Sequence, residues 1–336
     1  MVSRVFIDGA AGTTGLEIRE RLAARADVEL VQLSDADRKD TRARREALNE
    51  ADLVILCLPD EAAIEAVAMI ECNDVRVIDA STAHRTAPGW AYGFPEMEKD
   101  QRAKIASSTR VANPGCYPTG YLALVRPLIR AGIIPKDFPL TVNAVSGYSG
   151  GGKSMIEEFE KKDSPAYTET VVRTYAMTLA HKHVPEMKVH AGTTHPPVFA
   201  PSVGRYYRGM IVEVPLQLWA LPGKPAVFDL YKTLGEAYVG EKLVQVASFD
   251  RVLDAVKAVR EGKLVDFDLG DFMPSKSIDA EMLKLTNGME LFVFGNDKTQ
   301  QARLVAVLDN LGKGASGAAV QNMNIMLGLP ETTGLV

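Results

Sequence analysis

The sequence predicts an α/β protein in which a doubly wound parallel sheet is followed by an α+β domain. In the first third of the chain, short apolar runs alternate with amphipathic, helix-like stretches at the spacing of βαβ units. Further along, longer apolar runs are typical of an antiparallel sheet. The length of 336 residues is enough for two domains, each with its own core.

The composition fits an ordinary globular protein and excludes several classes. Hydrophobic residues make up 46% and charged residues 24% of the chain. A net charge of −5 gives no general attraction to nucleic acid or membranes, and no apolar run reaches membrane-spanning length. Because the chain starts in a strand-like run, we expect no signal peptide. Three cysteines, none at metal-ligand spacing with a histidine, suit a reducing compartment, so we expect a cytoplasmic protein without a metal.

The first candidate binding loop lies directly after the first predicted strand, residues 4–8, and leads into an amphipathic helix over 16–25. Glycine recurs at every third position of this loop: Gly9, Gly12 and Gly15. Such glycines allow a tight turn, close approach of a pyrophosphate and close packing of helix on strand. A second strand over 28–33 completes a βαβ unit. We therefore expect a dinucleotide with its pyrophosphate at the helix N-terminus.

The residues that follow the second strand bear on the choice of cofactor. Asp35 lies where NAD enzymes carry the acidic residue that holds the ribose 2′-hydroxyl. Ser34, Arg38 and Lys39 surround it, and a 2′-phosphate needs such donors. A solvated basic turn that continues into Arg42 is the alternative. We interpret the segment as a site for NADP rather than NAD.

Further strands over 52–58 and 75–79, with a helix over 61–71 between them, continue the alternation. Ligands of doubly wound sheets bind at the carboxyl ends of the strands. Residues 79–85, with the sequence Asp-Ala-Ser-Thr-Ala-His-Arg, follow such an end and offer two hydroxyls, a histidine and an arginine. The alternative is that the hydroxyls cap a helix and the two basic side chains are exposed.

The candidate nucleophile is Cys116, at the centre of Pro114-Gly115-Cys116-Tyr117-Pro118. It opens an apolar, helix-like stretch over 119–130. Its thiol would lie at a helix N-terminus, where unpaired N–H groups and the helix dipole stabilise a thiolate. The alternative is a small buried hydrophobic residue, since most free cysteines are structural. Cys57 and Cys72 receive no catalytic role.

The second half of the chain is predicted to form an α+β domain from five longer strands and three helices. The strands cover 140–147, 209–218, 280–285, 290–294 and 303–308, and the helices cover 153–161, 168–178 and 226–239.

Three segments of this half carry candidate chemistry. Residues 146–153 are rich in glycine and serine and are suited to bind an anion through backbone N–H groups, with a flexible linker as the alternative. Residues 181–186, His-Lys-His-Val-Pro-Glu, hold two of the five histidines, and a carboxylate three residues after His183 is suited to orient its ring. A polar surface corner is the alternative. Residues 313–322 open a helix with small residues, which permit contact with a backbone or a flat ring.

In order along nearly the whole chain, these motifs resemble the N-acetyl-gamma-glutamyl-phosphate reductase family in its shorter bacterial form. The matching motifs are Gly9 to Gly15, Asp79 to Arg85, Asn113 to Thr119, Ser146 to Gly150, His181 to Glu186 and Gly314 to Asn324. The resemblance implies a Rossmann domain over 1–115 and a glyceraldehyde-phosphate-dehydrogenase-like catalytic and oligomerisation domain over 116–300. It further implies a segment over 301–336 whose helix returns to the first domain.

The resemblance also implies a reaction of arginine biosynthesis, the NADPH-dependent reduction of N-acetyl-L-glutamyl 5-phosphate to the 5-semialdehyde with release of phosphate. Cys116 would form a thioester, and His183, oriented by Glu186, would act as acid and base. The expected substrate contacts are Arg85, Ser146, Ser149, His181 and Lys182. The expected cofactor contacts are Gly9, Gly12, Thr13, Thr14, Gly15, Ser34, Arg38, Lys39, Ser81, Gly314 and Asn322. A homo-oligomer, either dimer or tetramer, is expected, without nucleic-acid or membrane partners.

Three other interpretations stay open. A different acyl-phosphate reductase of the same architecture, such as aspartate-semialdehyde dehydrogenase, would share most features, but the His-x-His-x-Pro-Glu motif argues against it. A non-catalytic NADP-binding regulator is disfavoured by the presence of both Cys116 and His183. A cysteine hydrolase would not explain the glycine loop. The sequence also leaves open which of His181 and His183 is the acid and base.

Overall fold

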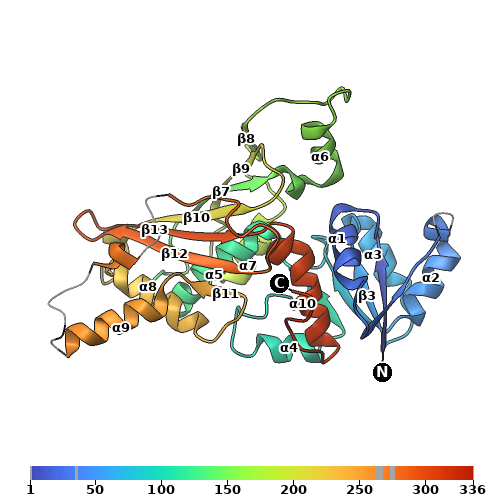
Figure 1. The fold of residues 1–336 in the computed structure, drawn as a ribbon, viewed down its shortest axis with the longest axis horizontal. Helices are drawn as coiled ribbons and strands as arrows, with labels where there is room; N and C mark the ends of the chain where they lie inside the picture. Colours follow the sequence, from blue (N-terminus) through green and yellow to red (C-terminus); the bar gives the residue numbers. More distant parts are fainter. Residues whose placement is uncertain (1, 35–36, 262, 264–267, 273–276, 336) are drawn as a thin grey trace.

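The computed structural model describes residues 2–34, 37–261, 263, 268–272 and 277–335. The described residues form two sheets, one built from the first third of the chain and one from the rest (Figure 1). The predicted fold class is confirmed by this arrangement of a parallel sheet A and a mixed sheet B.

Sheet A has the strand order β2-β1-β3-β4-β6-β5, and its neighbouring strands all run parallel. The strands are β1 (Ser3–Asp8), β2 (Val28–Val31), β3 (Leu53–Leu56), β4 (Arg76–Asp79), β5 (Ala91–Tyr92) and β6 (Arg110–Ala112). The helices are α1 (Thr13–Leu22), α2 (Thr41–Glu50), α3 (Asp60–Ala68) and α4 (Gln101–Ser107). Because β2 and β3 lie on opposite sides of β1, the loops after β1 and β3 diverge and leave a crevice at the carboxyl edge.

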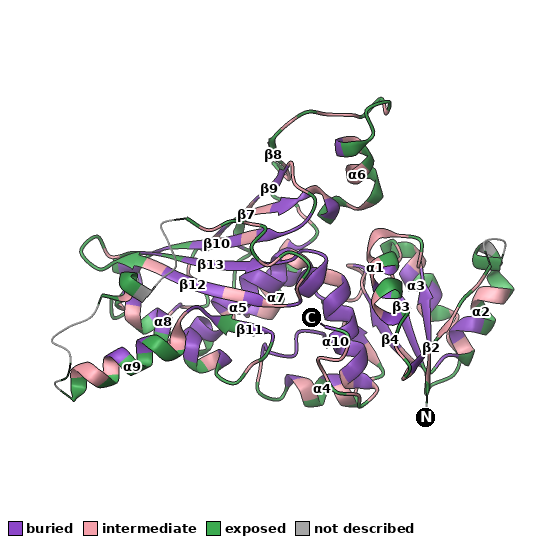
Figure 2. Ribbon diagram, viewed as in Figure 1, coloured by how far each residue is buried: buried purple, intermediate pink, exposed green. Residues whose placement is uncertain are grey.

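Sheet B has the order β11-β12-β13-β10-β7-β9-β8. The strands are β7 (Thr141–Gly147), β8 (Val172–Thr174), β9 (Val198–Gly204), β10 (Met210–Gln217), β11 (Val244–Val246), β12 (Met289–Asn296) and β13 (Gln301–Leu308). The predicted antiparallel sheet is mixed, since β7 pairs with β9 and β11 with β12 in parallel. The helices are α5 (Cys116–Arg130), α6 (Gly152–Glu160), α7 (Val184–Ala191), α8 (Val227–Tyr238) and α9 (Phe249–Arg260). Helices α5 and α8 contribute to the main core of this half (Figure 2).

Two predicted elements are wrong. The helix expected over 168–178 is absent, and β8 lies there as an edge strand on β9 because pairing with a neighbouring strand outweighs local helical spacing. The strand expected over 280–285 consists of turns, in which Met282 and Lys284 donate backbone hydrogen bonds to Asp279 and Glu281. The basic turn considered after residue 39 is the helix α2.

After β13 the chain turns back to sheet A. A π-helical turn over Gly312–Ser316 leads into α10 (Gly317–Met326), whose Val320 and Met323 join the core of sheet A (Figure 1). The division at residues 115 and 300 stays a prediction. The segment assigned to the third part begins with β13, a strand of sheet B.

Candidate active site

A cavity of about 200 Å³ lies where loops of both halves meet. Its walls come from the start of α1, the loop after β4, the start of α5, the turns before α6 and α7, and the segment after β13. They include Thr13, Thr14, Arg85, Asn113, Gly115, Cys116, Tyr117, Ser149, Tyr175, His181, Lys182, His183, Asn310 and Gly314. The cavity therefore joins the predicted nucleophile, the histidine pair and part of the glycine loop.

Cys116 is the first residue of α5, as the sequence predicts. Gly115 precedes it in an extended conformation, and no side chain among the described residues caps the helix. A Cβ on Gly115 would lie 2.6 Å from Nη1 of Arg85 and 2.7 Å from Nε2 of His183. On the other side, a Cβ on Gly314 would lie 2.8 Å from Cβ of Cys116. Glycine at both positions therefore lets the cationic, imidazole and thiol groups come together.

The two histidines have different surroundings. The backbone N–H of His183 donates to Nδ1 of His181 at 3.1 Å, so the proton of the neutral His181 ring lies on Nε2. Burial lowers the pKa of His181 to about 4, and Lys182 and Arg85 add to the effect. His183 is buried, and its Nδ1 has no hydrogen-bond partner among the described residues. Burial and the charge of Arg85 lower its pKa well below the usual range.

The predicted pairing of Glu186 with the His183 ring is wrong. Oε1 of Glu186 accepts hydrogen bonds from the Tyr92 hydroxyl at 2.7 Å and the Gly115 N–H at 2.8 Å. Oε2 accepts from Arg85 at 3.0 Å. His183 precedes α7 directly and Glu186 lies in its first turn, three residues later. The helix directs the Glu186 carboxylate to the Gly115 backbone instead of to the His183 ring.

Burial and the Arg85 guanidinium shift the pKa of the Cys116 thiol in opposite directions, and burial has the larger effect. Burial raises the pKa of Cys116 to about 11, while Arg85 and the backbone N–H of Tyr117 lower it. The expected stabilisation of a thiolate is therefore present but weaker than the effect of removing the sulfur from water. The thiol therefore carries its proton near neutral pH, and a nucleophilic role for it would require a base.

Of the two serines predicted to contact the substrate, only Ser149 lines the cavity. Its hydroxyl accepts a hydrogen bond from Asn310 at 2.9 Å. Ser146 is buried, donates to the Gly147 carbonyl and does not line the cavity.

Tyr175 and Asn310 line the cavity although the sequence motifs do not predict them. Tyr175 was assigned to a helix, and Asn310 follows a strand without any motif.

The glycine loop has the geometry that a dinucleotide needs. Gly9 has a φ of +87°, and a side chain there would collide with the Cys57 carbonyl. A Cβ on Gly15 would lie 2.8 Å from Cα of Ala10. In the described part of the chain, no side chain caps the N-terminus of α1, which begins at Thr13. Its free N–H groups and the close-packed loop therefore fit a pyrophosphate.

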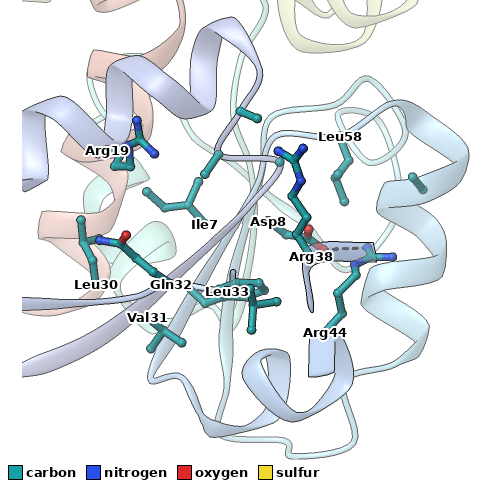
Figure 3. Close-up of a pocket in the computed structure, with 15 residues that line it drawn as sticks. Ile7, Asp8, Arg19, Leu30, Val31, Gln32, Leu33, Arg38, Arg44 and Leu58 are labelled. Carbon is teal, nitrogen blue, oxygen red and sulfur yellow. Dashed lines mark hydrogen bonds and ion pairs between the residues drawn. The ribbon is translucent and has the colours of Figure 1, made fainter. Parts of the chain in front are cut away.

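A second cavity, of about 510 Å³, lies beside this loop and is lined by residues of β1, β2 and α2 (Figure 3). Gly9 and Arg38 line it, and Arg44 reaches it from α2 and forms an ion pair with Asp8 at 2.8 Å. The Ser34 hydroxyl donates to Asp37 at 2.7 Å. Asp35 and the Lys39 side chain lie outside the described residues.

Five predicted cofactor contacts do not line either cavity: Gly12, Gly15, Ser34, Ser81 and Asn322. Ser81 donates to the buried carboxylate of Asp79 at 2.6 Å. Asn322 is fully buried and donates to Gly93 and Asn113. It therefore supports Asn113, which does line the cavity around Cys116.

Within the described ranges, no cluster of three or more His, Cys, Asp or Glu side chains is arranged to hold a metal ion. None of the helices in the described part of the chain is both long and apolar enough to cross a membrane.

Two family models match the chain. Residues 4–105 match "Semialdehyde dehydrogenase, NAD binding domain", and residues 116–310 match "Semialdehyde dehydrogenase, dimerisation domain". The chain therefore belongs to the class of the semialdehyde dehydrogenases.

Curated relatives narrow the class. The chain is 51% identical to N-acetyl-gamma-glutamyl-phosphate reductase 2 of Nostoc sp. over 99% of both chains. It is 49% identical to the Brucella anthropi protein named N-acetyl-gamma-glutamyl-phosphate reductase, over 98% of this chain and 99% of that one. The chain belongs to the N-acetyl-gamma-glutamyl-phosphate reductase family. The resemblance seen in the sequence is confirmed, and the chain is an oxidoreductase.

Solved structures support the fold. Aspartate semialdehyde dehydrogenase II from Vibrio cholerae, complexed with ASA, aligns with a TM-score of 0.69 at 14% identity, over 98% of this chain and 99% of that one. Aspartate semialdehyde dehydrogenase with NADP from Candida albicans aligns with a TM-score of 0.59 at 12% identity, over 97% and 99%. At these identities the likeness concerns the fold alone.

Changing Gly115 to alanine tests the packing around the nucleophile. We expect Gly115→Ala to lower kcat by about 10²-fold or more, because displacing reacting groups by roughly 1 Å has that effect. Gly288→Ala is the matched control, since the nearest atom to its added Cβ would be 3.7 Å away. Steady-state kinetics and circular dichroism of both variants check this; near-normal turnover of folded Gly115→Ala would contradict it.

Proposed function

We propose that the chain reduces N-acetyl-L-glutamyl 5-phosphate with NADPH to N-acetyl-L-glutamate 5-semialdehyde, with release of phosphate, in arginine biosynthesis. The observation that carries this is the meeting of Cys116, His183 and Arg85 with the start of α1 in one cavity. A cysteine hydrolase would need the thiol and the imidazole but not the dinucleotide loop. A reducing cytoplasm suits a reaction that depends on a free thiol.

The first half of the reaction starts at the thiol. Nε2 of His183 lies beside Gly115, next to Cys116, and takes the thiol proton as sulfur attacks the acyl carbon. The S–C bond forms, the bond from carbon to the phosphate oxygen breaks, and phosphate leaves. A neutral imidazole accepts a proton at Nε2 and, once protonated, donates it again, so the His183 ring is able to serve both halves of the reaction.

The second half returns the thiol. Bound NADPH supplies the hydride that reduces the thioester. His183 gives its proton to the oxygen of the resulting hemithioacetal and takes the hydroxyl proton back as the C–S bond breaks. The products are the semialdehyde and the cysteine thiolate, which then recovers a proton.

The anionic substrate needs cationic and N–H donors. Arg85 and Lys182 line the cavity as cations, and His181 offers its Nε2–H as a neutral donor. We assign the phosphate to this group of donors, with Ser149 beside it. Ser146 lies behind the wall and contributes to its shape.

We assign the second cavity to the adenosine end of NADP. Arg38 and Arg44 bring positive charge to it, and Asp8 is already paired with Arg44. The described part of the wall therefore offers a 2′-phosphate more attraction than a 2′-hydroxyl. Thr13 and Thr14 line the cavity of Cys116, which suits a nicotinamide end directed at the thioester.

We also propose that copies of the chain associate through sheet B, as a dimer or tetramer. The support is the match to a dimerisation domain over 116–310. Pro215 of β10, Phe294 of β12 and Trp219, which directly follows β10, line a further cavity of about 710 Å³, and Trp219 is 57% exposed.

The function is tested by assaying the purified protein in reverse with N-acetyl-glutamate semialdehyde, phosphate and NADP. We expect turnover with this aldehyde and much less with aspartate semialdehyde. Cys116→Ser should abolish turnover and leave NADPH binding near normal, since the dinucleotide loop lies between β1 and α1 and does not include Cys116. Retained turnover of Cys116→Ser would refute the thioester, and a preference for aspartate semialdehyde would refute the substrate.

The two histidines are separated by kinetics. We expect His183→Asn to lower kcat by about 10²–10⁴-fold with little change in KM, which is the usual effect of losing an acid–base group. His181→Asn should chiefly raise KM for the acyl phosphate, because the shorter side chain no longer places an N–H donor where the Nε2–H of His181 lies. The reverse pattern, with kcat collapsing only in His181→Asn, would exchange their roles.

Cofactor choice is tested at Arg38. We expect Arg38→Ala to weaken NADPH binding by roughly 1–3 kcal/mol, the range for charge-assisted hydrogen bonds, while NADH binding hardly changes. Arg42→Ala is the control, because its exposed guanidinium pairs with Glu46 on the same surface of α2. Fluorescence titration with both cofactors decides the matter; equal weakening of NADPH and NADH would show that Arg38 does not bind the 2′-phosphate.

A further inference from the structure

Tyr92 lies behind the active site although nothing in the sequence motifs points to it. It ends β5, the edge strand of sheet A, and only 4% of its surface is exposed. Its hydroxyl donates to Oε1 of Glu186 at 2.7 Å. Its ring stacks on His190 with 3.6 Å between the ring centroids. Tyr92 therefore connects sheet A with α7.

Glu186 connects Tyr92 with two residues beside Cys116, Arg85 and Gly115. The carboxylate is 1% exposed and accepts from Tyr92, from the Gly115 N–H and from Arg85. A buried carboxylate is held in place by such a complete set of donors, and losing one of them leaves charge unsatisfied.

Arg85 is fixed on both its side chain and its backbone. Its Nε donates to the Asn113 carbonyl at 3.0 Å and its Nη2 to the Ala80 carbonyl at 3.0 Å. Nε2 of His190 lies 2.6 Å from the Arg85 carbonyl oxygen. Tyr92 thus touches both residues of α7, Glu186 and His190, that hold Arg85.

We propose that Tyr92 is a positioning residue for Cys116, which it controls by holding Glu186 and thereby the Arg85 guanidinium and the Gly115 backbone. The inference rests on the proposed role of Cys116 as nucleophile. Its physical basis is the electrostatic field at the Cys116 sulfur. The Arg85 guanidinium and the Glu186 carboxylate, which form an ion pair, contribute to this field with opposite sign. The hydroxyl dipole of Tyr92 offsets part of the carboxylate charge.

The direction of the effect follows from the contacts. Arg85 lowers and Glu186 raises the pKa of Cys116. Without the Tyr92 hydroxyl, the carboxylate charge is less satisfied and counteracts Arg85 more strongly. The remaining ionisable groups around the thiol come from α5, the segment after β8 and the turn before α7: Tyr117, Tyr175, His181, Lys182 and His183. All of them stay unchanged in a variant that removes one hydroxyl.

The test is Tyr92→Phe, which keeps the ring and its stack on His190. The rate of Cys116 alkylation by iodoacetamide is followed against pH by mass spectrometry of the peptide that contains Cys116. We expect the midpoint to move to higher pH, and both alkylation at pH 8 and kcat to fall about 5- to 30-fold. KM for the acyl phosphate should change less than about 2-fold, because no substrate contact is removed.

Tyr121→Phe is the matched control. Tyr121 is fully buried in α5, and its hydroxyl has no partner among the described residues. The same chemical change there should leave the alkylation midpoint where it is. Glu186→Gln should move the midpoint in the opposite direction, to lower pH, since it removes the charge that opposes Arg85. In the double variant, Tyr92→Phe should add little to Glu186→Gln.

An unchanged midpoint in folded Tyr92→Phe would overturn the proposal, as would an equal shift in Tyr121→Phe. A Tyr92→Phe protein that only melts earlier, with normal alkylation and kcat, would assign Tyr92 a purely structural role and would also overturn it. Alkylation needs neither substrate nor NADPH. Failure of the proposed reductase activity would therefore leave this measurement valid, and the two failures are distinguishable.

Discussion

The buried ion pair between Lys313 and Glu96 constrains how the two sheets meet. Both side chains are almost fully buried, and Nζ of Lys313 lies 2.8 Å from each carboxylate oxygen and 2.6 Å from Gln321. Removing one partner of such a pair leaves an unpaired buried charge, at a cost of about 3–5 kcal/mol. Because Lys313 belongs to the π-helical turn and Glu96 to the segment after β5, the pair fixes the last part of the chain against sheet A.

The active site depends on that attachment. The π-helical turn carries Gly314, which packs against Cys116. The turn is also held from its start, where Asp309 accepts from the N–H groups of Leu311 and Gly312 and pairs with Arg208 at 2.7 Å. Arg208 in turn pairs with Glu17 of α1 at 3.2 Å. One stretch of backbone therefore links α1, Cys116 and both sheets.

How far the site was predictable differs from residue to residue. The position of Cys116 at a helix start and the strand–loop–helix unit around Gly9 follow from local patterns, and both are present. Glu186 shows where such reasoning fails. Its three-residue spacing from His183 suggested one contact, and the carboxylate instead binds Tyr92, Gly115 and Arg85. Tyr92 lies 94 residues away along the chain, a distance at which local spacing carries no information.

The sequence alone determined the fold class, the family, the position of Cys116 at a helix start and the parallel first sheet, because glycine spacing, apolar periodicity and helix starts are local properties of the chain. The tertiary structure decided the rest. It decided that β8 is an edge strand, that Asn322 supports Asn113 from the core, and that burial raises the pKa of Cys116. Strand pairing, removal of charge from water and the partners of a buried carboxylate all depend on segments distant in the chain, which only folding brings into contact.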